Sequence, residues 1–183
     1  IIRNMLDFSR KREQLPAPED LTELLEKSLE LAAGDYDLKK HYDFREIEIV
    51  RHYSPDVPPV FCEGNLIQQV FFNLIRNGAE AMSDKEYPTG GPKFRFTVHR
   101  VQDSVVVEME DNGPGMKESV RKRVFEPFYT TKGSEKGTGL GLSVSCFIIT
   151  NQHNGTMEVF SSPGNWTRFV ISLPLESRDR ASA

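Results

Sequence analysis

Residues 63–82 read EGNLIQQVFFNLIRNGAEAM, the most informative stretch for the architecture of this chain. Apolar residues recur there every three or four positions, which predicts a helix over residues 63–82 with one apolar face. Asn73 and Asn77 are four positions apart, so their amides project from one side of that helix. Two interpretations stay open: a pair of exposed asparagines, or buried amides whose oxygens suit a magnesium ion.

The segments around this helix alternate between helical and strand patterns. Helices are expected over residues 19–33 and about 138–153, and strands over residues 46–53, 93–101, 104–110, 155–161 and 166–173. Gln102-Asp103 predicts a hairpin between the second and third strands, and the glycine- and proline-containing residues 112–137 predict a mobile loop. This order of elements favours a two-layer α/β sandwich, an α+β fold with a mainly antiparallel sheet.

Composition limits the class of protein. The chain has 183 residues, 38% of them hydrophobic and 27% charged, with a formal net charge of −4. That suits one compact domain, or one domain with a short appendage, and excludes a disordered chain. The slight acidity argues against a nucleic-acid scaffold, and no apolar run is long enough to span a bilayer. Cys62 and Cys146 are expected to be reduced thiols in the core.

The two ends of the chain differ from the middle. Residues 1–14 combine apolar positions with the basic run Arg10-Lys11-Arg12, which predicts an amphipathic helix that needs a partner. Pro16 and Pro18 end that helix. We expect residues 1–14 to be the tail of an upstream helical element; the alternative is a simple N-terminal helix that docks on its own domain. Residues 176–183 are polar and predicted to be a flexible tail.

Asp111 follows the strand predicted over residues 104–110. Strand alternation places it on the same face as Val105, Val107 and Met109, so its carboxylate ends an apolar row and needs a hydrogen-bond donor. A glycine turn, residues 112–115, follows at once and would let the backbone approach a ligand closely. Such an acceptor could bind an exocyclic amine such as that of adenine. The alternative is a turn aspartate that bonds to its own backbone.

A second glycine-rich segment, Gly137-Thr138-Gly139-Leu140-Gly141-Leu142, opens the last predicted helix. Its exposed amide groups would lie at the positive end of that helix, which is suited to an anion. The spacing is neither the dinucleotide fingerprint nor the Walker loop. The aromatic residues just before it, in residues 124–132, indicate a lid. Lys132 could neutralise phosphate charge there; a solvated lysine is the alternative.

Four motifs in this order are recognisable as a set: Asn73–Ala79, Asp111–Met116, Phe125–Phe128 and Gly137–Leu142. They resemble the N, G1, F and G2 boxes of the ATP-binding domain of bacterial two-component sensor histidine kinases, in the gyrase/Hsp90/histidine kinase/MutL superfamily. The resemblance covers about residues 15–175 and implies a Bergerat-type ATP-binding fold. Residues 1–14 similarly resemble the end of the second helix of the dimerisation and histidine-phosphotransfer domain.

The resemblance implies a role for each matching residue. Asn77 would hold Mg²⁺, with Asn73 in the same cluster, and Asp111 would accept a hydrogen bond from the adenine amine. The residues expected around the rest of the nucleotide are Gly113, Gly115, Lys132, Gly137, Thr138, Gly139, Leu140 and Gly141, and those expected to anchor the lid are Phe125 and Phe128.

Three positions depart from the family pattern. Gly78 stands where alanine is more common. Glu80 stands where many members place a phosphate-contacting lysine, so Lys132 or Arg76 would have to supply that contact. Trp166 replaces a glycine of a G-x-G-T-x-F element, which leaves open whether the backbone can approach a neighbour there.

The family also implies the reaction. ATP would donate its γ-phosphoryl group to a histidine of the dimerisation domain, for relay to a response regulator receiver domain. The family further implies a homodimer in the full-length protein and a cytoplasmic location for this part of it, with neither nucleic acid nor membrane as its partner.

The four histidines of the chain, at positions 41, 52, 99 and 153, lack the sequence context of a phosphoacceptor, which is therefore expected upstream of residue 1. Two other functions compete with the kinase. An ATPase like gyrase or Hsp90 would need a glutamate at position 73, where asparagine cannot act as a base. A regulatory module without nucleotide would not need the intact motifs.

Overall fold

The computed structural model describes residues 15–34, 44–131 and 138–175. Its helical elements are α2 (Leu21–Gly34), η1 (Phe44–Glu46), α4 (Gly64–Ser83), α5 (Glu118–Arg121), α6 (Gly141–Phe147) and the π-helical η2 (Ile148–Gln152). Its strands are β1 (Ala17–Glu19), β2 (Glu48–Tyr53), β3 (Val60–Cys62), β4 (Lys93–Val101), β5 (Ser104–Asp111), β6 (Thr156–Ser162) and β7 (Trp166–Pro174). The expectations for residues 1–14 and 176–183 lie outside the described residues.

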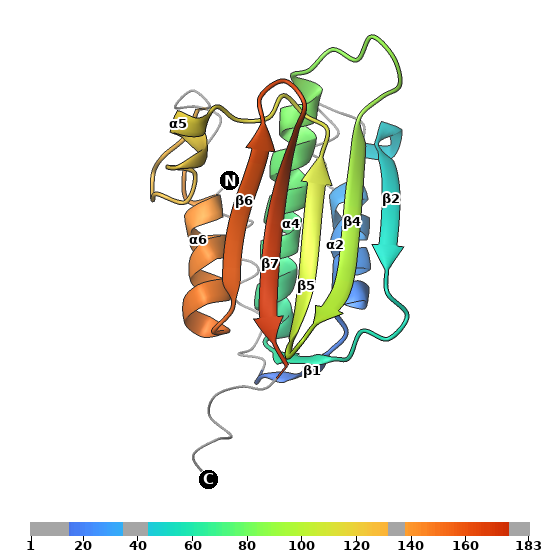
Figure 1. Cartoon of the computed structure of the whole chain (residues 1–183), viewed down its shortest axis with the longest axis vertical. Helices are drawn as coiled ribbons and strands as arrows, with labels where there is room; N and C mark the ends of the chain where they lie inside the picture. Colours follow the sequence, from blue (N-terminus) through green and yellow to red (C-terminus); the bar gives the residue numbers. More distant parts are fainter. Residues whose placement is uncertain (1–14, 35–43, 132–137, 176–183) are drawn as a thin grey trace.

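Five strands form one sheet in the order β2-β4-β5-β7-β6; helices α2 and α4 lie behind it, and α6 lies at its β6 edge (Figure 1). Strand β2 runs parallel to β4, and the other neighbours are antiparallel. The predicted two-layer α+β sandwich with a mainly antiparallel sheet is therefore confirmed. A small second sheet, in which β1 pairs with β3, was not predicted from the proline-rich residues 15–18.

Alternation along the strands separates a core face from an open face. On β4, Phe94, Phe96 and Val98 are buried, and the apolar face of α4 packs into the same core. On β5 the buried positions are every second residue, and Asp111 continues that row with 4% of its surface exposed. The strand alternation thus placed Asp111 correctly, at the end of the sheet where α4 also ends (Figure 1).

The last predicted helix is two elements. Regular α-helix runs from Gly141 to Phe147, and a π-helical segment completes it to Gln152. His153 then closes the segment: its Nδ1 lies 2.9 Å from the carbonyl oxygen of Ile148, and its Nε2 accepts a hydrogen bond of 3.1 Å from the backbone N–H of Glu63. His153 therefore joins this helix to the start of α4, in agreement with a structural role.

The segment predicted as one mobile loop, residues 112–137, is more structured than expected. The turn at residues 112–115 is followed by the short helix α5 and by a series of turns up to residue 128. Val124 is buried, and Phe125 packs edge-on against Phe169 of β7 with ring centroids 6.3 Å apart. Apolar side chains within the segment therefore fix its first half to the sheet.

Asp20 caps helix α2. Its Oδ1 accepts hydrogen bonds from the backbone N–H groups of Thr22 and Glu23, at 2.8 and 3.4 Å. We expect Asp20→Ala to lower the free energy of unfolding by about 1 kcal/mol, and Asp20→Asn to lower it far less, because asparagine caps equally well. Urea unfolding measures both; equal losses in the two variants would contradict a capping role.

Candidate functional site

Asn73, the first asparagine of the pair on α4, faces the start of α6. Asn73 is half-buried, and its Nδ2 donates a hydrogen bond of 3.0 Å to Oγ of the buried Ser145. A Cβ at Gly141 would lie 2.6 Å from Oδ1 of Asn73, so only glycine lets the two helices meet this closely. Asn77 lies one turn further along α4 and is also half-buried. The structure thus brings together Asn73 and Gly141, two residues that were both expected in the nucleotide site.

Asp111 lies at the end of β5, beside the glycine turn. Its Oδ1 accepts a hydrogen bond of 2.9 Å from the backbone N–H of Gly113, so the self-bonded turn is present. Its Oδ2 faces Gly78 of α4, where an added Cβ would lie 3.3 Å away. Burial raises the pKa of Asp111 to about 7, although the Gly113 N–H and Lys85 oppose the increase. A buried carboxyl group with one oxygen bonded is well prepared to accept a donor at the other.

The glycine turn is fixed against the β6–β7 hairpin. Gly115 has a φ of +65°, and a Cβ there would overlap the carbonyl oxygen of Ser162. Gly164 donates its N–H to the carbonyl oxygen of Pro114 at 2.6 Å. The carbonyl oxygen of Trp166 lies 3.1 Å from the Cβ position of Gly115, so the backbone does approach closely at Trp166 despite the lost glycine.

The second glycine segment, residues 137–142, is hydrogen-bonded to the aromatic segment that precedes it, residues 124–131. Phe128 donates its N–H to the carbonyl oxygen of Gly139 at 2.9 Å. Gly139 has a φ of +65°, and a Cβ there would overlap the backbone of Phe128. Phe128 is 74% exposed, so the contact that the structure shows for it is the backbone bond to Gly139. Phe125 packs on Phe169 of the sheet, and its role as a lid anchor stays a prediction.

The remaining predicted site residues lie around the second glycine segment and on α4. The backbone N–H of Leu140 lies 3.4 Å from Oγ1 of the exposed Thr138. Lys132 and Gly137 lie outside the described residues, so their roles stay predictions. Arg76 bonds to Glu80 one turn along α4, with Nε 2.9 Å from Oε1. Glu80 thus holds a basic side chain near the position where the family places a lysine.

The side chains present suit Mg²⁺, which is held largely by phosphates and waters, better than a metal ion held by protein side chains alone. In the described ranges, no three His, Cys, Asp or Glu side chains form a group that could hold a metal ion. Asn77 can offer one neutral amide oxygen, and Mg²⁺ is commonly held by few protein oxygens together with phosphates and waters. The residues present therefore fit an ion that arrives with a phosphate ligand.

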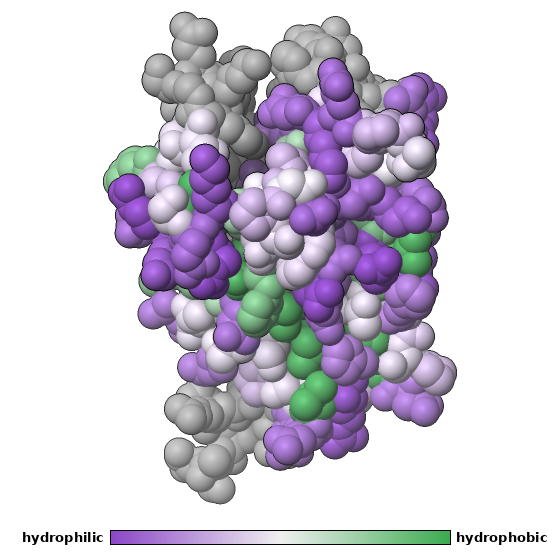
Figure 2. All heavy atoms as spheres, turned by 45° about the horizontal axis from the view of Figure 1, so that its top comes forward, coloured by the Kyte–Doolittle hydropathy of each residue, from purple (hydrophilic) through white to green (hydrophobic). Residues whose placement is uncertain are grey.

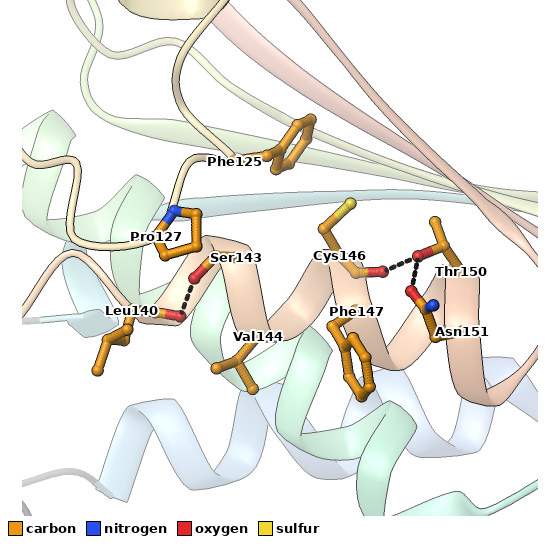
Figure 3. A pocket seen from close by; sticks show the side chains of 9 residues that line it. All are labelled: Phe125, Pro127, Leu140, Ser143, Val144, Cys146, Phe147, Thr150 and Asn151. Atoms are coloured by element: carbon orange, nitrogen blue, oxygen red, sulfur yellow. Dashed lines mark hydrogen bonds between the residues drawn. The ribbon is translucent and has the colours of Figure 1, made fainter.

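An apolar hollow lies beside this site, between the aromatic segment and α6 (Figure 3). Its lining residues are Phe125, Pro127, Leu140, Ser143, Val144, Cys146, Phe147, Thr150 and Asn151. It shares Leu140 with the glycine segment but includes neither Asn77 nor Asp111. By contrast, the surface seen when the top of Figure 1 is turned forward is largely hydrophilic (Figure 2).

Comparisons with known proteins agree with this arrangement. The model of the histidine kinase-, DNA gyrase B- and HSP90-like ATPase family matches residues 62–177. Sporulation kinase E of Bacillus subtilis (strain 168) is 35% identical over 96% of this chain. The sensory histidine kinase/phosphatase NtrB of Vibrio alginolyticus is 36% identical over 86% of it. The nucleotide-free catalytic domain of histidine kinase ThkA superposes with a TM-score of 0.71 at 26% identity, covering 88% of this chain and 97% of that one.

The fold is therefore that of a histidine kinase catalytic domain. The chain belongs to the family of histidine kinase-, DNA gyrase B- and HSP90-like ATPases. It spans 22% of the length of sporulation kinase E and 43% of that of NtrB. None of the helices in the described ranges has the length and hydropathy of a membrane-spanning helix.

Two supporting side chains were not found from the sequence. Asn112 ties the turn to the start of β4: its Oδ1 accepts from the N–H of Lys93 at 2.8 Å, and its Nδ2 donates to the carbonyl oxygen of Gly91 at 3.0 Å. Lys85, from the loop between α4 and β4, reaches the same turn. Asn112 lies in the Asp111–Met116 motif, but its side-chain role and that of Lys85 could not be read from the sequence, because each bonds to residues that are distant in the sequence.

Proposed function

We propose that this chain binds ATP with Mg²⁺ and is the phosphoryl-donating part of a sensor histidine kinase. The observation that supports it best is the position of Asp111, which is buried among glycines at the end of the sheet where α4 ends. Oδ1 is held by Gly113 and Oδ2 faces Gly78, so the second oxygen would accept the adenine amine. The family to which the chain belongs supports the same assignment.

The proposal gives the other site residues distinct tasks. Asn77 would hold the ion, which when bound neutralises charge on the phosphates. The backbone of residues 137–141, including Thr138, would line the phosphates, with Lys132 or Arg76 as the basic group. Catalysis would come from positioning and charge neutralisation. The acceptor would be a histidine of the dimerisation domain, whose second helix would end in residues 1–14.

The partners follow from the same proposal. A response regulator receiver domain would take the phosphoryl group from the histidine, and the full-length protein would be a homodimer that works from the cytoplasm. The names of the relatives, a sporulation kinase and a sensory histidine kinase/phosphatase, support this class of reaction.

The asparagine at position 73 argues against hydrolysis of ATP as the main reaction. This amide donates to Ser145 and has no basic nitrogen or carboxylate with which to activate water. The site therefore favours transfer to an acceptor over transfer to water.

The test is phosphoryl transfer from radiolabelled Mg-ATP. We expect no label on the histidines of this chain, and label on a separately supplied dimerisation domain that contains the phosphoacceptor. A matched acceptor with that histidine replaced by glutamine should stay unlabelled. Steady release of phosphate without any acceptor, at the rate seen with it, would contradict the proposal and favour an ATPase.

A further inference from the structure

Lys85 connects three loops at the end of the sheet that holds Asp111. It follows the C-terminus of α4, where its backbone N–H donates to the carbonyl oxygen of Met82 at 3.2 Å. Its Nζ lies 2.7 Å from the carbonyl oxygen of Asn112, 3.1 Å from that of Gly113 and 3.4 Å from that of Asn165. The first two oxygens belong to the glycine turn and the third to the β6–β7 hairpin.

Three carbonyl dipoles that converge on one point repel one another unless a cation lies between them. An ammonium group has three N–H donors and no acceptor, which matches this set. Hydrogen bonds from a charged donor are also shorter and stronger than neutral ones. The Tyr87 ring adds a cation–π contact, since its centroid is 5.3 Å from Nζ. Lys85 thus takes the place that a bound metal ion would have in a carbonyl cluster.

The two bonded carbonyls directly follow Asp111 in the chain. The peptide group between Asn112 and Gly113 donates its N–H to Oδ1 of Asp111 at 2.9 Å and offers its oxygen, that of Asn112, to Lys85. One peptide plane is therefore held from both sides. Its orientation determines which oxygen of Asp111 is occupied and which remains for a ligand.

We propose that Lys85 is the positioning residue of the adenine pocket, because it fixes the turn that orients Asp111. This rests on the proposed function, since it assumes that Asp111 accepts the adenine amine. Lys85 makes no contact with the nucleotide in this proposal and acts only through the turn. Glu80, which replaces the lysine common in the family, bonds to Arg76 and plays no part in this proposal.

The pKa of Asp111 distinguishes an effect of the Lys85 charge from a purely structural role of this side chain. Burial has the largest effect on the pKa of Asp111, and of the neighbouring charges Glu110 raises it and Lys85 lowers it. The pKa of Tyr87 is raised first by its own burial and then by Asp111. Removal of the Lys85 ammonium should therefore move the titration of Asp111 to higher pH. Loss of packing alone would expose the carboxyl group and move it to lower pH.

The experiment compares Lys85→Met, Lys85→Gln and Lys85→Arg with the matched control Lys27→Met, which removes the same charge from the surface of α2. Calorimetry with Mg-ADP and NMR titration of the Asp111 carboxyl carbon in nucleotide-free protein are the two measurements. We expect Lys85→Met to bind Mg-ADP about tenfold more weakly, equivalent to about 1.4 kcal/mol, and to titrate at higher pH. Lys85→Arg should restore little affinity, because its planar donors cannot converge on three oxygens.

Affinity within twofold of the wild type in folded Lys85→Met and Lys85→Gln would overturn the proposal, as would an equal loss in Lys27→Met. If the wild type itself bound no Mg-ADP, the proposed function would fail, and the NMR measurement would still decide the role of Lys85. NMR chemical-shift changes limited to residues 111–116 and Asn165, together with titration of Asp111 at higher pH, would support the proposal that Lys85 acts through the turn. An unchanged Asp111 titration would exclude it.

Discussion

Asp111→Asn is expected to weaken the binding of Mg-ADP at least a hundredfold without harm to the fold. A carboxylate has two acceptor oxygens, and Gly113 already uses one of them. Asparagine has one acceptor, so if its oxygen serves Gly113, its NH₂ group faces the adenine amine and two donors oppose each other. A lost hydrogen bond to a charged group costs about 1.5–3 kcal/mol, and the unpaired donors add to this cost. Calorimetry at pH 8 measures the loss.

The pH dependence of binding provides the internal check. Burial raises the pKa of Asp111 to about 7 from its ordinary value of 3.8. The adenine amine needs the ionised carboxylate, whose fraction falls about tenfold per unit below that pKa. Wild-type affinity should therefore fall about tenfold from pH 8 to pH 6. The residual affinity of Asp111→Asn should change only as the phosphates titrate, so the ratio of the two affinities isolates Asp111.

Stability should respond in the opposite direction. Because the folded-state pKa is raised, ionisation of Asp111 destabilises the folded protein progressively as the pH rises from about 4 to about 7, and fully above that. Asparagine removes this cost, so the variant should unfold at a urea concentration equal to or above that of the wild type at pH 8. Undiminished Mg-ADP affinity in this folded variant would contradict the adenine assignment.

The sequence predicted this site wherever a local pattern determines a position. Strand parity placed Asp111 on the buried face of β5, and helical spacing placed Asn73 and Asn77 on one side of α4. The predicted strand over residues 93–101 has the observed bounds, because alternation and the following turn define both ends. Patterns of two and of three to four residues contain this information directly.

What the sequence did not predict depends on tertiary contacts. The pairing of β1 with β3 joins two three-residue strands with no periodicity of their own. Phe128 was expected to anchor the lid; in the structure it is largely exposed, has a φ of +65° and bonds to Gly139 through its backbone N–H. Lys85 looks like any lysine in a loop, and its three acceptors come from two other parts of the chain.

Gly115→Ala is expected to lose both stability and nucleotide affinity. At a φ of +65° an alanine costs about 1–2 kcal/mol through its own backbone. Its Cβ would also overlap the carbonyl oxygen of Ser162, so the hairpin would have to move away from the turn. That movement would break the bond from the Gly164 N–H to the carbonyl oxygen of Pro114. We expect a total loss of about 3 kcal/mol, in the range of the severe single substitutions.

Gly164→Ala is the matched control, because it lies in the same hairpin with a φ of +79° and has nothing within 4 Å of its Cβ position. It should lose only the backbone cost of about 1–2 kcal/mol and should bind Mg-ADP nearly as well as the wild type. Urea unfolding and calorimetry on both variants separate the two effects. Equal losses of stability in the two variants would contradict the close contact of the turn with the hairpin. If Gly115→Ala keeps full affinity despite its lower stability, the turn does not shape the adenine pocket.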